Sequence, residues 1–326
     1  MKSMIKISTL SLLYMATTFM FLLNGCANTK VEPSQSDAIP SMTVSKNSLP
    51  KNLTFGMIYP MTYPAYEMIT QDASSLADKY NIKLVVNAPD EPSTEQQIRI
   101  MESMIKQHVD AIAISPVDSA ALTPIINQAV TAGIPVVTFE SDAPQSLRTA
   151  YVGADNYETG QQAARTISNL LDHKGMIFVE NGIEDMLSMK QRLQGFLDYL
   201  HHESSIVVLD VRHNQGSESI ATEHIESMIE AHPHFDAMVG LDFVSASAST
   251  LIWKAKGLNR NVVSTGVTTA SNEALINGQI TAVISQNEDR WGAFIMDTLL
   301  KASQDKQVDH WIDTETLKLT QETVNK

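Results

Sequence analysis

The sequence predicts an α/β protein made of two doubly wound, parallel-sheet lobes joined by a hinge. Short apolar runs of strand length alternate with segments of helical spacing along most of the chain. The same alternation begins again near residue 150, so two sets of similar size follow one another without a long linker. A chain of 326 residues is also too long for one small core, whereas lobes of roughly 100–150 residues are ordinary folding units.

The first set of elements runs strand, helix, strand, helix, strand, helix, strand. We expect strands at 53–59, 82–86, 110–114 and 134–139, and helices at 66–80, 94–107 and 120–132. A helix between successive strands returns the chain to the same end of the sheet. The strands are therefore expected to be parallel and covered by helices on both faces.

The second set continues this order. Expected strands are 150–152, 176–179, 206–209, 237–241, 262–264 and 280–285; expected helices are 159–171, 188–201, 218–231, 245–256, 273–276 and 290–303. We assign 52–154 plus 287–306 to an N-terminal lobe and 155–286 plus 307–326 to a C-terminal lobe. Ligands of such sheets bind beyond the carboxyl ends of the strands, so two facing lobes predict a cleft between them.

The first 25 residues are typical of a signal peptide. Lys2 and Lys6 precede an uncharged, mostly apolar run over 7–23, which is too short and too interrupted by hydroxyl residues for a membrane span. The run ends in Leu-Asn-Gly-Cys26, which resembles the lipidation motif of bacterial lipoproteins. Cys26 is then the lipid-bearing residue and 26–51 a flexible tether; a signal peptide with a chance cysteine is the alternative.

Composition and motifs argue against several classes of function. The net charge of −14 becomes −16 once Lys2 and Lys6 leave with the signal peptide, and so acidic a chain disfavours a nucleic-acid partner. A single cysteine cannot form a disulfide framework, and neither a zinc-protease, a nucleophile-elbow nor a phosphate-loop motif occurs. We therefore expect neither catalysis nor a bound metal or cofactor.

Four stretches in order resemble the periplasmic sugar-binding family typified by ribose-binding protein, which has the type I solute-binding fold. They are 110–119 (DAIAISPVDS), 132–140 (AGIPVVTFE), 151–160 (YVGADNYETG) and 280–287 (ITAVISQN). The resemblance extends over 52–303. It implies a monomeric, extracytoplasmic protein that closes on a small polar ligand, which in that family is a monosaccharide or a sugar-like molecule. Repressors of the same fold carry a DNA-binding motif at the N-terminus. In this sequence the expected signal peptide and tether occupy that position, which disfavours a repressor.

The resemblance implies ligand contacts in the N-terminal lobe. Tyr63 and Tyr66 follow the first strand, where the family carries an amide and aromatic residues, and are expected to stack on the ligand. Tyr66 has an alternative role as the first buried residue of its helix. Glu140 keeps the family's carboxylate after the fourth strand, while Ser141 stands where the family commonly has arginine.

The C-terminal lobe and the last crossing strand supply the other expected contacts. Lys190 aligns with the family's ligand-binding arginine; Arg192 is the second candidate, with helix anchoring as its alternative role. Asp242 aligns with an asparagine, and Gln286 matches a glutamine close to the hinge. Trp291 is either a ring plate for the ligand or a helix-packing residue.

Ser141, Lys190 and Asp242 differ from the residues that the family commonly has at these positions, so ribose itself is not the expected ligand. Two roles in the cell remain open. The first role is delivery of the ligand to a membrane ABC permease. The second is sensing, in which a membrane histidine kinase or chemoreceptor reads the closure of the lobes. Both roles use the same cleft, so the sequence does not distinguish them.

Overall fold

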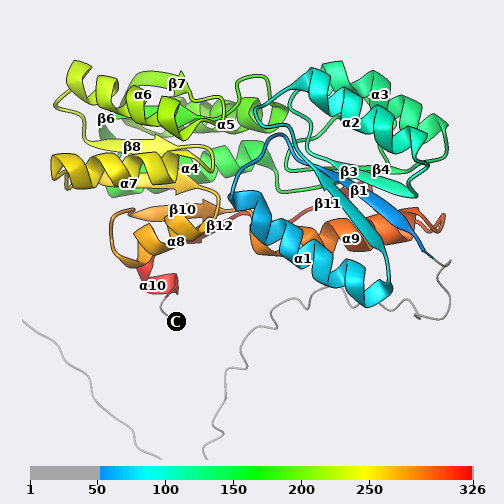
Figure 1. Ribbon diagram of the computed structural model, residues 1–326. Helices are drawn as coiled ribbons and strands as arrows, with labels where there is room; N and C mark the ends of the chain where they lie inside the picture. Colours follow the sequence, from blue (N-terminus) through cyan, green and yellow to red (C-terminus); the bar gives the residue numbers. More distant parts are fainter. Residues whose placement is uncertain (1–51, 325–326) are drawn as a thin grey trace, which may run out of the picture. The chain divides into compact units, whose positions relative to one another are not determined.

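The computed structural model describes residues 52–324, which form two α/β lobes (Figure 1). Each lobe is built on one six-stranded sheet with helices on both faces. The predicted fold class is thereby confirmed. The expected signal peptide, Cys26 and the tether lie outside the described residues. Between residues 52 and 324, none of the helices has both the length and the apolar character needed to cross a membrane.

The N-terminal lobe contains a sheet in the order β11-β5-β4-β3-β1-β2, and all its pairings are parallel. Its strands are β1 (Thr54–Ile58), β2 (Lys83–Asn87), β3 (Ala111–Ile114), β4 (Val136–Phe139), β5 (Ala150–Val152) and β11 (Trp311–Ile312). Strands β3, β4 and β5 are buried throughout. This explains why they appear in the sequence as continuous apolar runs rather than as alternating patterns.

The C-terminal lobe contains a sheet in the order β12-β10-β9-β8-β6-β7. Its strands are β6 (Lys174–Asn181), β7 (Ser205–His213), β8 (Ala237–Gly240), β9 (Asn261–Thr265), β10 (Ala282–Ser285) and β12 (Leu317–Leu319). Only β12 is antiparallel to its neighbour. Strands β6 and β7 are longer than expected because they continue beyond the apolar run into polar residues.

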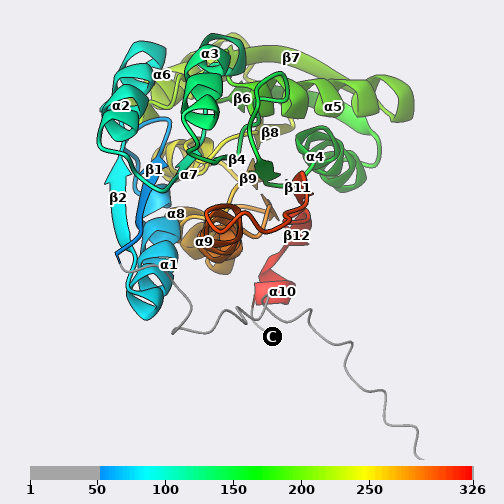
Figure 2. The same ribbon diagram turned by 90° about the vertical axis from the view of Figure 1, so that its right-hand side faces the viewer.

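Helices sandwich both sheets. In the N-terminal lobe, α1 (Ala65–Tyr80) and α9 (Trp291–Ala302) cover one face, while α2 (Thr94–Lys106) and α3 (Ser119–Thr131) cover the other (Figure 2). In the C-terminal lobe, α4 (Asn156–Leu170) and α5 (Leu187–Glu203) pack opposite α6 (Glu218–Ala231), α7 (Ser245–Lys256) and α8 (Thr269–Ile276). The short helices η2 (Glu288–Arg290) and α10 (Gln321–Val324) complete the described elements.

The chain passes between the lobes three times, and the structure corrects the position of the third crossing. Crossings were expected after residues 154, 286 and 306, so all of 307–326 was assigned to the C-terminal lobe. Instead β11 pairs with β5 of the N-terminal sheet, and β12 then pairs with β10 of the C-terminal sheet. A two-residue strand has no recognisable periodicity, and the free edge of β5 is a tertiary feature. The sequence pattern therefore placed this crossing too early.

Polar contacts tie the crossing segments together. The Asn287 side-chain amide donates to the carbonyl of Thr314 at 2.6 Å, and the hydroxyls of Thr159 and Thr316 are 2.8 Å apart. Asn287 has a left-handed backbone, with φ of 56°. These bonds hold three chain segments, far apart in sequence, at one place between the sheets.

The hydrophobic cores extend across the boundary between the lobes. One buried cluster contains Tyr66 and Phe139 of the N-terminal lobe together with Phe243 of the C-terminal lobe. A second joins side chains of α2 and α3 to Ile183 and Met186. The facing surfaces of the lobes are therefore partly apolar, and they are in direct contact in this structure.

Candidate ligand cleft

A cavity of about 20 Å³ lies between the lobes, where the carboxyl ends of strands from both sheets meet. That volume suffices for about one water molecule. The cavity is lined from the N-terminal lobe by Met61, Tyr63, Tyr66 and Glu140, and from the C-terminal lobe by Gly182, Ile183, Met186, Met189, Asn214, Gly216, Asp242, Phe243 and Val244. Its position is the one where parallel sheets bind ligands.

Tyrosines from the end of β1 and the start of α1 form the N-terminal wall. The rings of Tyr59 and Tyr66 stack with centroids 4.6 Å apart, and Phe139 meets Tyr59 edge-on at 5.6 Å. Tyr63 is half-buried, and its hydroxyl donates across the boundary to the Phe243 carbonyl at 3.5 Å. Burial raises the pKa of Tyr63 to about 12, so this phenol stays protonated at neutral pH.

Glu140 follows β4 and is almost completely buried. Its carboxylate accepts hydrogen bonds from the Tyr66 hydroxyl, at 3.0 and 3.2 Å, and from the Ser115 hydroxyl at 2.9 Å. Its backbone has a φ of 60°, in the left-handed region that non-glycine residues seldom adopt. The Glu140 carbonyl accepts bonds from Tyr151 and Asn156, which hold it in this conformation.

Burial dominates the electrostatics of Glu140. Loss of water raises the pKa of its carboxyl group to about 7, although hydrogen bonds from Ser115 and Tyr66 and the nearby charge of Arg192 act in the opposite direction. The pKa of Tyr66 is raised as well, by burial and then by the Glu140 charge. Near neutral pH, Glu140 is therefore divided between its charged and neutral forms.

The C-terminal wall is organised by Asp242, which follows β8. Its Oδ1 accepts from the backbone amides of Val244 and Ser245 at 2.6 and 2.8 Å, so it caps the start of α7. Its Oδ2 accepts from the Ser245 hydroxyl at 2.8 Å and from the Asn214 amide at 2.9 Å. Burial raises the pKa of Asp242, and these four bonds lower it.

Phe243 and Met61 narrow the space between the lobes. Phe243 meets Tyr66 edge-on at 6.1 Å, and Gly266 gives it room, since a Cβ there would lie 2.2 Å from the ring. In the same way the sulfur of Met61 would lie 2.3 Å from a Cβ at Gly216 of the facing lobe. These close approaches explain why the cavity is small.

Arg192 stands behind the cavity, in a network that links the crossing segments. Its Nη2 donates to Asn156 Oδ1 at 2.8 Å and to Gln286 Oε1 at 3.2 Å, and its Nη1 donates to the Leu241 carbonyl at 2.5 Å. Gln286 in turn donates to Asn156 and Thr159 at 3.0 and 2.9 Å. Burial lowers the pKa of Arg192, and the neighbouring acids, Glu140 first, raise it.

The structure places Lys190 and Arg192 differently from the sequence expectation. Lys190 is exposed on α5, and its ammonium pairs with Asp185 at 3.2 Å. A helix turns by 100° per residue, so side chains two positions apart face nearly opposite sides, and only Arg192 points inward. It does not line the cavity, and its bonds fit the helix-anchoring role.

Ser141 and Trp291 also lie outside the cavity lining. The Ser141 hydroxyl accepts from the Ser188 amide at 3.3 Å and so connects the two lobes directly. Trp291 is fully buried at the start of α9, where its indole N–H donates to the Gln286 carbonyl at 2.9 Å. Its ring meets Phe243 edge-on at 6.4 Å, which places it behind the cavity wall.

Several lining residues were not identified from the sequence. These residues lie at the carboxyl edge of the C-terminal sheet. Gly182 and Asn214 come directly after strands β6 and β7, and Phe243 lies in the loop that follows β8. The rule that ligands bind at this edge would have found them. The methionines of the lining carried no such signal, because methionine is common in ordinary cores.

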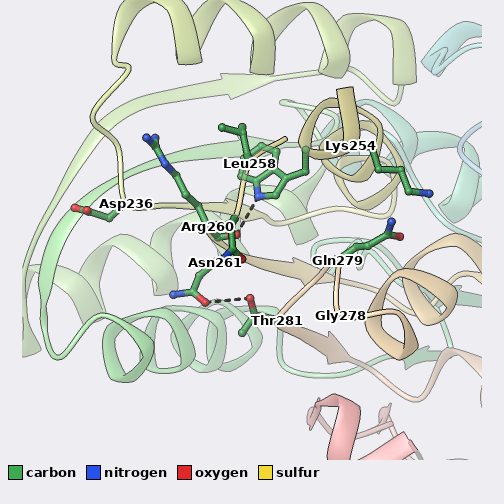
Figure 3. A pocket seen from close by; sticks show the side chains of 10 residues that line it. Asp236, Lys254, Leu258, Arg260, Asn261, Gly278, Gln279 and Thr281 are labelled. Carbon is green, nitrogen blue, oxygen red and sulfur yellow. Dashed lines mark hydrogen bonds between the residues drawn. The ribbon is translucent and has the colours of Figure 1, made fainter. Parts of the chain in front are cut away.

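Three other hollows are found in the described part of the chain, two of which bear on the site. Figure 3 shows one of about 340 Å³ around Lys254, Arg260 and Asn261, at the amino ends of β8, β9 and β10. This end of a parallel sheet is not where ligands bind. A groove of about 470 Å³ adjoins the cleft on the N-terminal lobe and shares Tyr63 and Tyr66 with it. Across 52–324, no cluster of three metal-binding side chains is found.

Comparisons with known proteins agree with this architecture. Residues 55–307 match a family model described as a periplasmic binding protein domain. The ribose import binding protein RbsB of Bacillus subtilis is 26% identical over 223 residues, which cover 68% of this chain and 70% of that protein.

Solved structures share the fold. An ABC transporter solute-binding protein of Burkholderia graminis, solved with D-arabinose, is 23% identical, with a TM-score of 0.80 over 84% of this chain and 97% of that one. The XylFII–LytSN complex contains a chain that is 20% identical, with a TM-score of 0.78 over 84% and 99%. Because the family model spans more than three quarters of the sequence, the chain belongs to the periplasmic binding protein domain family.

Proposed function

We propose that this protein captures a small polar ligand, a monosaccharide or a sugar-like molecule, between its two lobes outside the cytoplasm. The observation that carries the proposal is the cavity at the facing strand ends, which is lined by the rings of Tyr66 and Phe243 and by the carboxylate of Glu140. Aromatic rings pack on the apolar faces of a sugar, and a carboxylate accepts hydrogen bonds from its hydroxyls. The names of the relatives, for ribose and arabinose, support the same ligand class.

Ligand entry requires the lobes to separate. A cavity of about 20 Å³ is far below the roughly 300 Å³ of a small-molecule site, so a monosaccharide does not fit without movement. The crossing segments near Gln286 provide a pivot for rigid-body opening, and the flexible side chains of Met61, Met186 and Met189 can change rotamer. The ligand then favours closure because it contacts both lobes only in the closed form.

A lipid on Cys26 would keep the protein at a membrane surface, where an ABC permease receives the ligand from the closed form. A lipid anchor and a tether allow this without a membrane-spanning helix. In this proposal the protein acts as a monomer, because each chain carries a complete cleft of its own.

Sensing is the second candidate function. It is favoured by one structural relative, XylFII, which was solved in complex with a second protein, LytSN. In this alternative, closure of the lobes around the ligand is read by a membrane histidine kinase or chemoreceptor instead of a permease. The cleft and its chemistry are the same in both cases.

A ligand screen tests the proposal. The purified protein is titrated calorimetrically and heated with ribose, arabinose, allose, galactose, glucose and fucose. A ligand at 100 times its dissociation constant is expected to stabilise the protein by about 2.7 kcal/mol. Tyr63→Ala, which removes a cleft wall, should weaken binding at least about tenfold. Tyr157→Ala, which removes an exposed tyrosine of α4, should not.

Two outcomes contradict the proposal. If no sugar or sugar-like compound binds to the well-folded protein, the ligand class is wrong. If a sugar binds and Tyr63→Ala leaves its affinity unchanged, the cleft is not the site. Uptake of the bound sugar by cells that lack the gene then separates the roles, because loss of uptake indicates transport and a lost transcriptional response indicates sensing.

A further inference from the structure

The inventory of hydrogen-bonding groups around the cavity is strongly one-sided. The Tyr66 hydroxyl donates to Glu140, the Tyr63 hydroxyl donates to the Phe243 carbonyl, and the Asn214 amide donates to Asp242. The two tyrosine hydroxyls and one N–H of the Asn214 amide are thus already engaged by protein acceptors. Acceptor lone pairs remain available on Glu140. Its Oε1 receives only the longer contact, 3.2 Å, from the Tyr66 hydroxyl, which it shares with Oε2.

The charges around the cavity are also one-sided. Two carboxylates, Glu140 and Asp242, line it, and the described lining contains no lysine or arginine. Glu140 receives hydrogen bonds only from neutral hydroxyl groups. The guanidinium of Arg192, which lies nearby, is directed at the carbonyl of Leu241 and at side-chain amides.

The remaining lining is suited to a cation. The rings of Tyr66 and Phe243 line the cavity, where they meet edge-on at 6.1 Å, and one side of Tyr66 is covered by the stacked ring of Tyr59. An aromatic face attracts a cation through its quadrupole, and Phe243 is the ring of this pair on which Tyr59 does not stack. An ammonium group has three donors and no acceptor, whereas each sugar hydroxyl also carries lone pairs that need donors. A cavity of about 20 Å³ matches one ammonium group as well as it matches one water molecule.

We propose that the ligand of this cleft carries a protonated amine, which sits on the carboxylate of Glu140 beside the rings of Tyr66 and Phe243. The ligand class is therefore an amino sugar or an aminated polyol. The inference rests on the proposed function, since it assigns the chemistry of a ligand to the same cleft. Burial raises the pKa of Glu140, and a bound ammonium offsets that cost by favouring the charged carboxylate.

Matched ligand sets test the amine. Calorimetric titration at pH 7 compares D-glucosamine with D-glucose and N-acetyl-D-glucosamine, D-galactosamine with D-galactose and N-acetyl-D-galactosamine, and 1-amino-1-deoxy-D-glucitol with D-glucitol. In at least one set the amine is expected to bind about tenfold or more tightly than its uncharged partners. A ratio of this size corresponds to the free energy of one hydrogen bond to a charged group. Equal or tighter binding of the uncharged members in every set overturns the inference.

Variants test the seat of the amine. Glu140→Gln keeps the shape and removes the charge, so the ratio of amine affinity to uncharged-partner affinity should fall to about unity. Phe243→Leu should reduce the preference severalfold by removing a ring face. Glu102→Gln, at an exposed position of α2, should leave it unchanged. Unliganded unfolding temperatures confirm that each variant is folded.

The outcomes separate this inference from the proposed function. Binding of uncharged sugars without amine preference overturns the inference and leaves sugar capture in place. If the preference for the amine persists in Glu140→Gln, the amine does not bind at the Glu140 carboxylate, and the assigned position is wrong. Absence of binding by every member of the three sets, together with the sugars of the first screen, overturns both.

Discussion

Replacement of Glu140 by glutamine should change how the stability of the protein depends on pH. Burial raises the pKa of this carboxyl group from an ordinary 4.5 to about 7, so the folded state favours the protonated form. Its contribution to stability is therefore complete below about pH 4.5 and is lost as the pH rises through 7. Glutamine resembles the protonated carboxyl in shape and does not titrate.

The magnitude follows from the difference between the two pKa values. A difference of about 2.5 corresponds to about 3 kcal/mol, of which about 2 to 3 kcal/mol is lost between pH 5 and pH 8. The wild-type free energy of unfolding should fall by that amount relative to Glu140→Gln over this interval. For lobes of this size it corresponds to a difference of roughly 5–10 °C in unfolding temperature.

Urea unfolding at 25 °C, followed by tryptophan fluorescence and circular dichroism at pH 5, 6, 7 and 8, measures the effect. Glu180, whose pKa burial raises to about 9, changes stability in the same direction, but it is present in both proteins and cancels in the comparison. Glu102→Gln, at an exposed position, should follow the wild type throughout. Wild-type and Glu140→Gln curves that stay parallel within about 0.5 kcal/mol from pH 5 to 8 would refute the reasoning.

Three further substitutions test other parts of the structure. Gln286→Ala removes the bonds to Asn156 and Arg192. We expect the free energy of unfolding in urea to fall by about 2–3 kcal/mol and ligand binding in calorimetry to weaken. A fall below about 0.5 kcal/mol contradicts the role of this network as the pivot. Lys190→Ala should change neither stability by more than about 0.5 kcal/mol nor ligand affinity, because this side chain is exposed; a large affinity loss would return it to the site. Gly160→Ala places a Cβ 1.9 Å from the Arg192 carbonyl, so helices α4 and α5 must move apart. The unfolding temperature should therefore drop by several degrees. An unchanged unfolding temperature would show that the two helices can move apart without loss of stability.

Much of the architecture could be predicted because each element has a local cause. The continuous apolar runs at β3 and β4 are fully buried strands, and helices such as α2 show their apolar spacing in the sequence. The polar cleft residues that follow β4 and β8, Glu140 and Asp242, could be found in the same way, since they come where a strand ends. Repetition of this pattern was enough to predict two lobes.

Tertiary structure alone decided the position of the third crossing of the chain, the size of the cavity and the role of each site residue. The sequence does not reveal that β11 returns to the edge of β5, because strand pairing depends on which edge is free. It does not distinguish an exposed Lys190 from a buried Arg192, because that depends on which face of α5 packs against the sheet. The cavity is small because Phe243 lies on Gly266 and Met61 lies on Gly216, contacts between residues far apart in the chain. Local patterns determine the elements and their ends, whereas the volume and the hydrogen-bonding balance of a cleft arise only when two lobes meet.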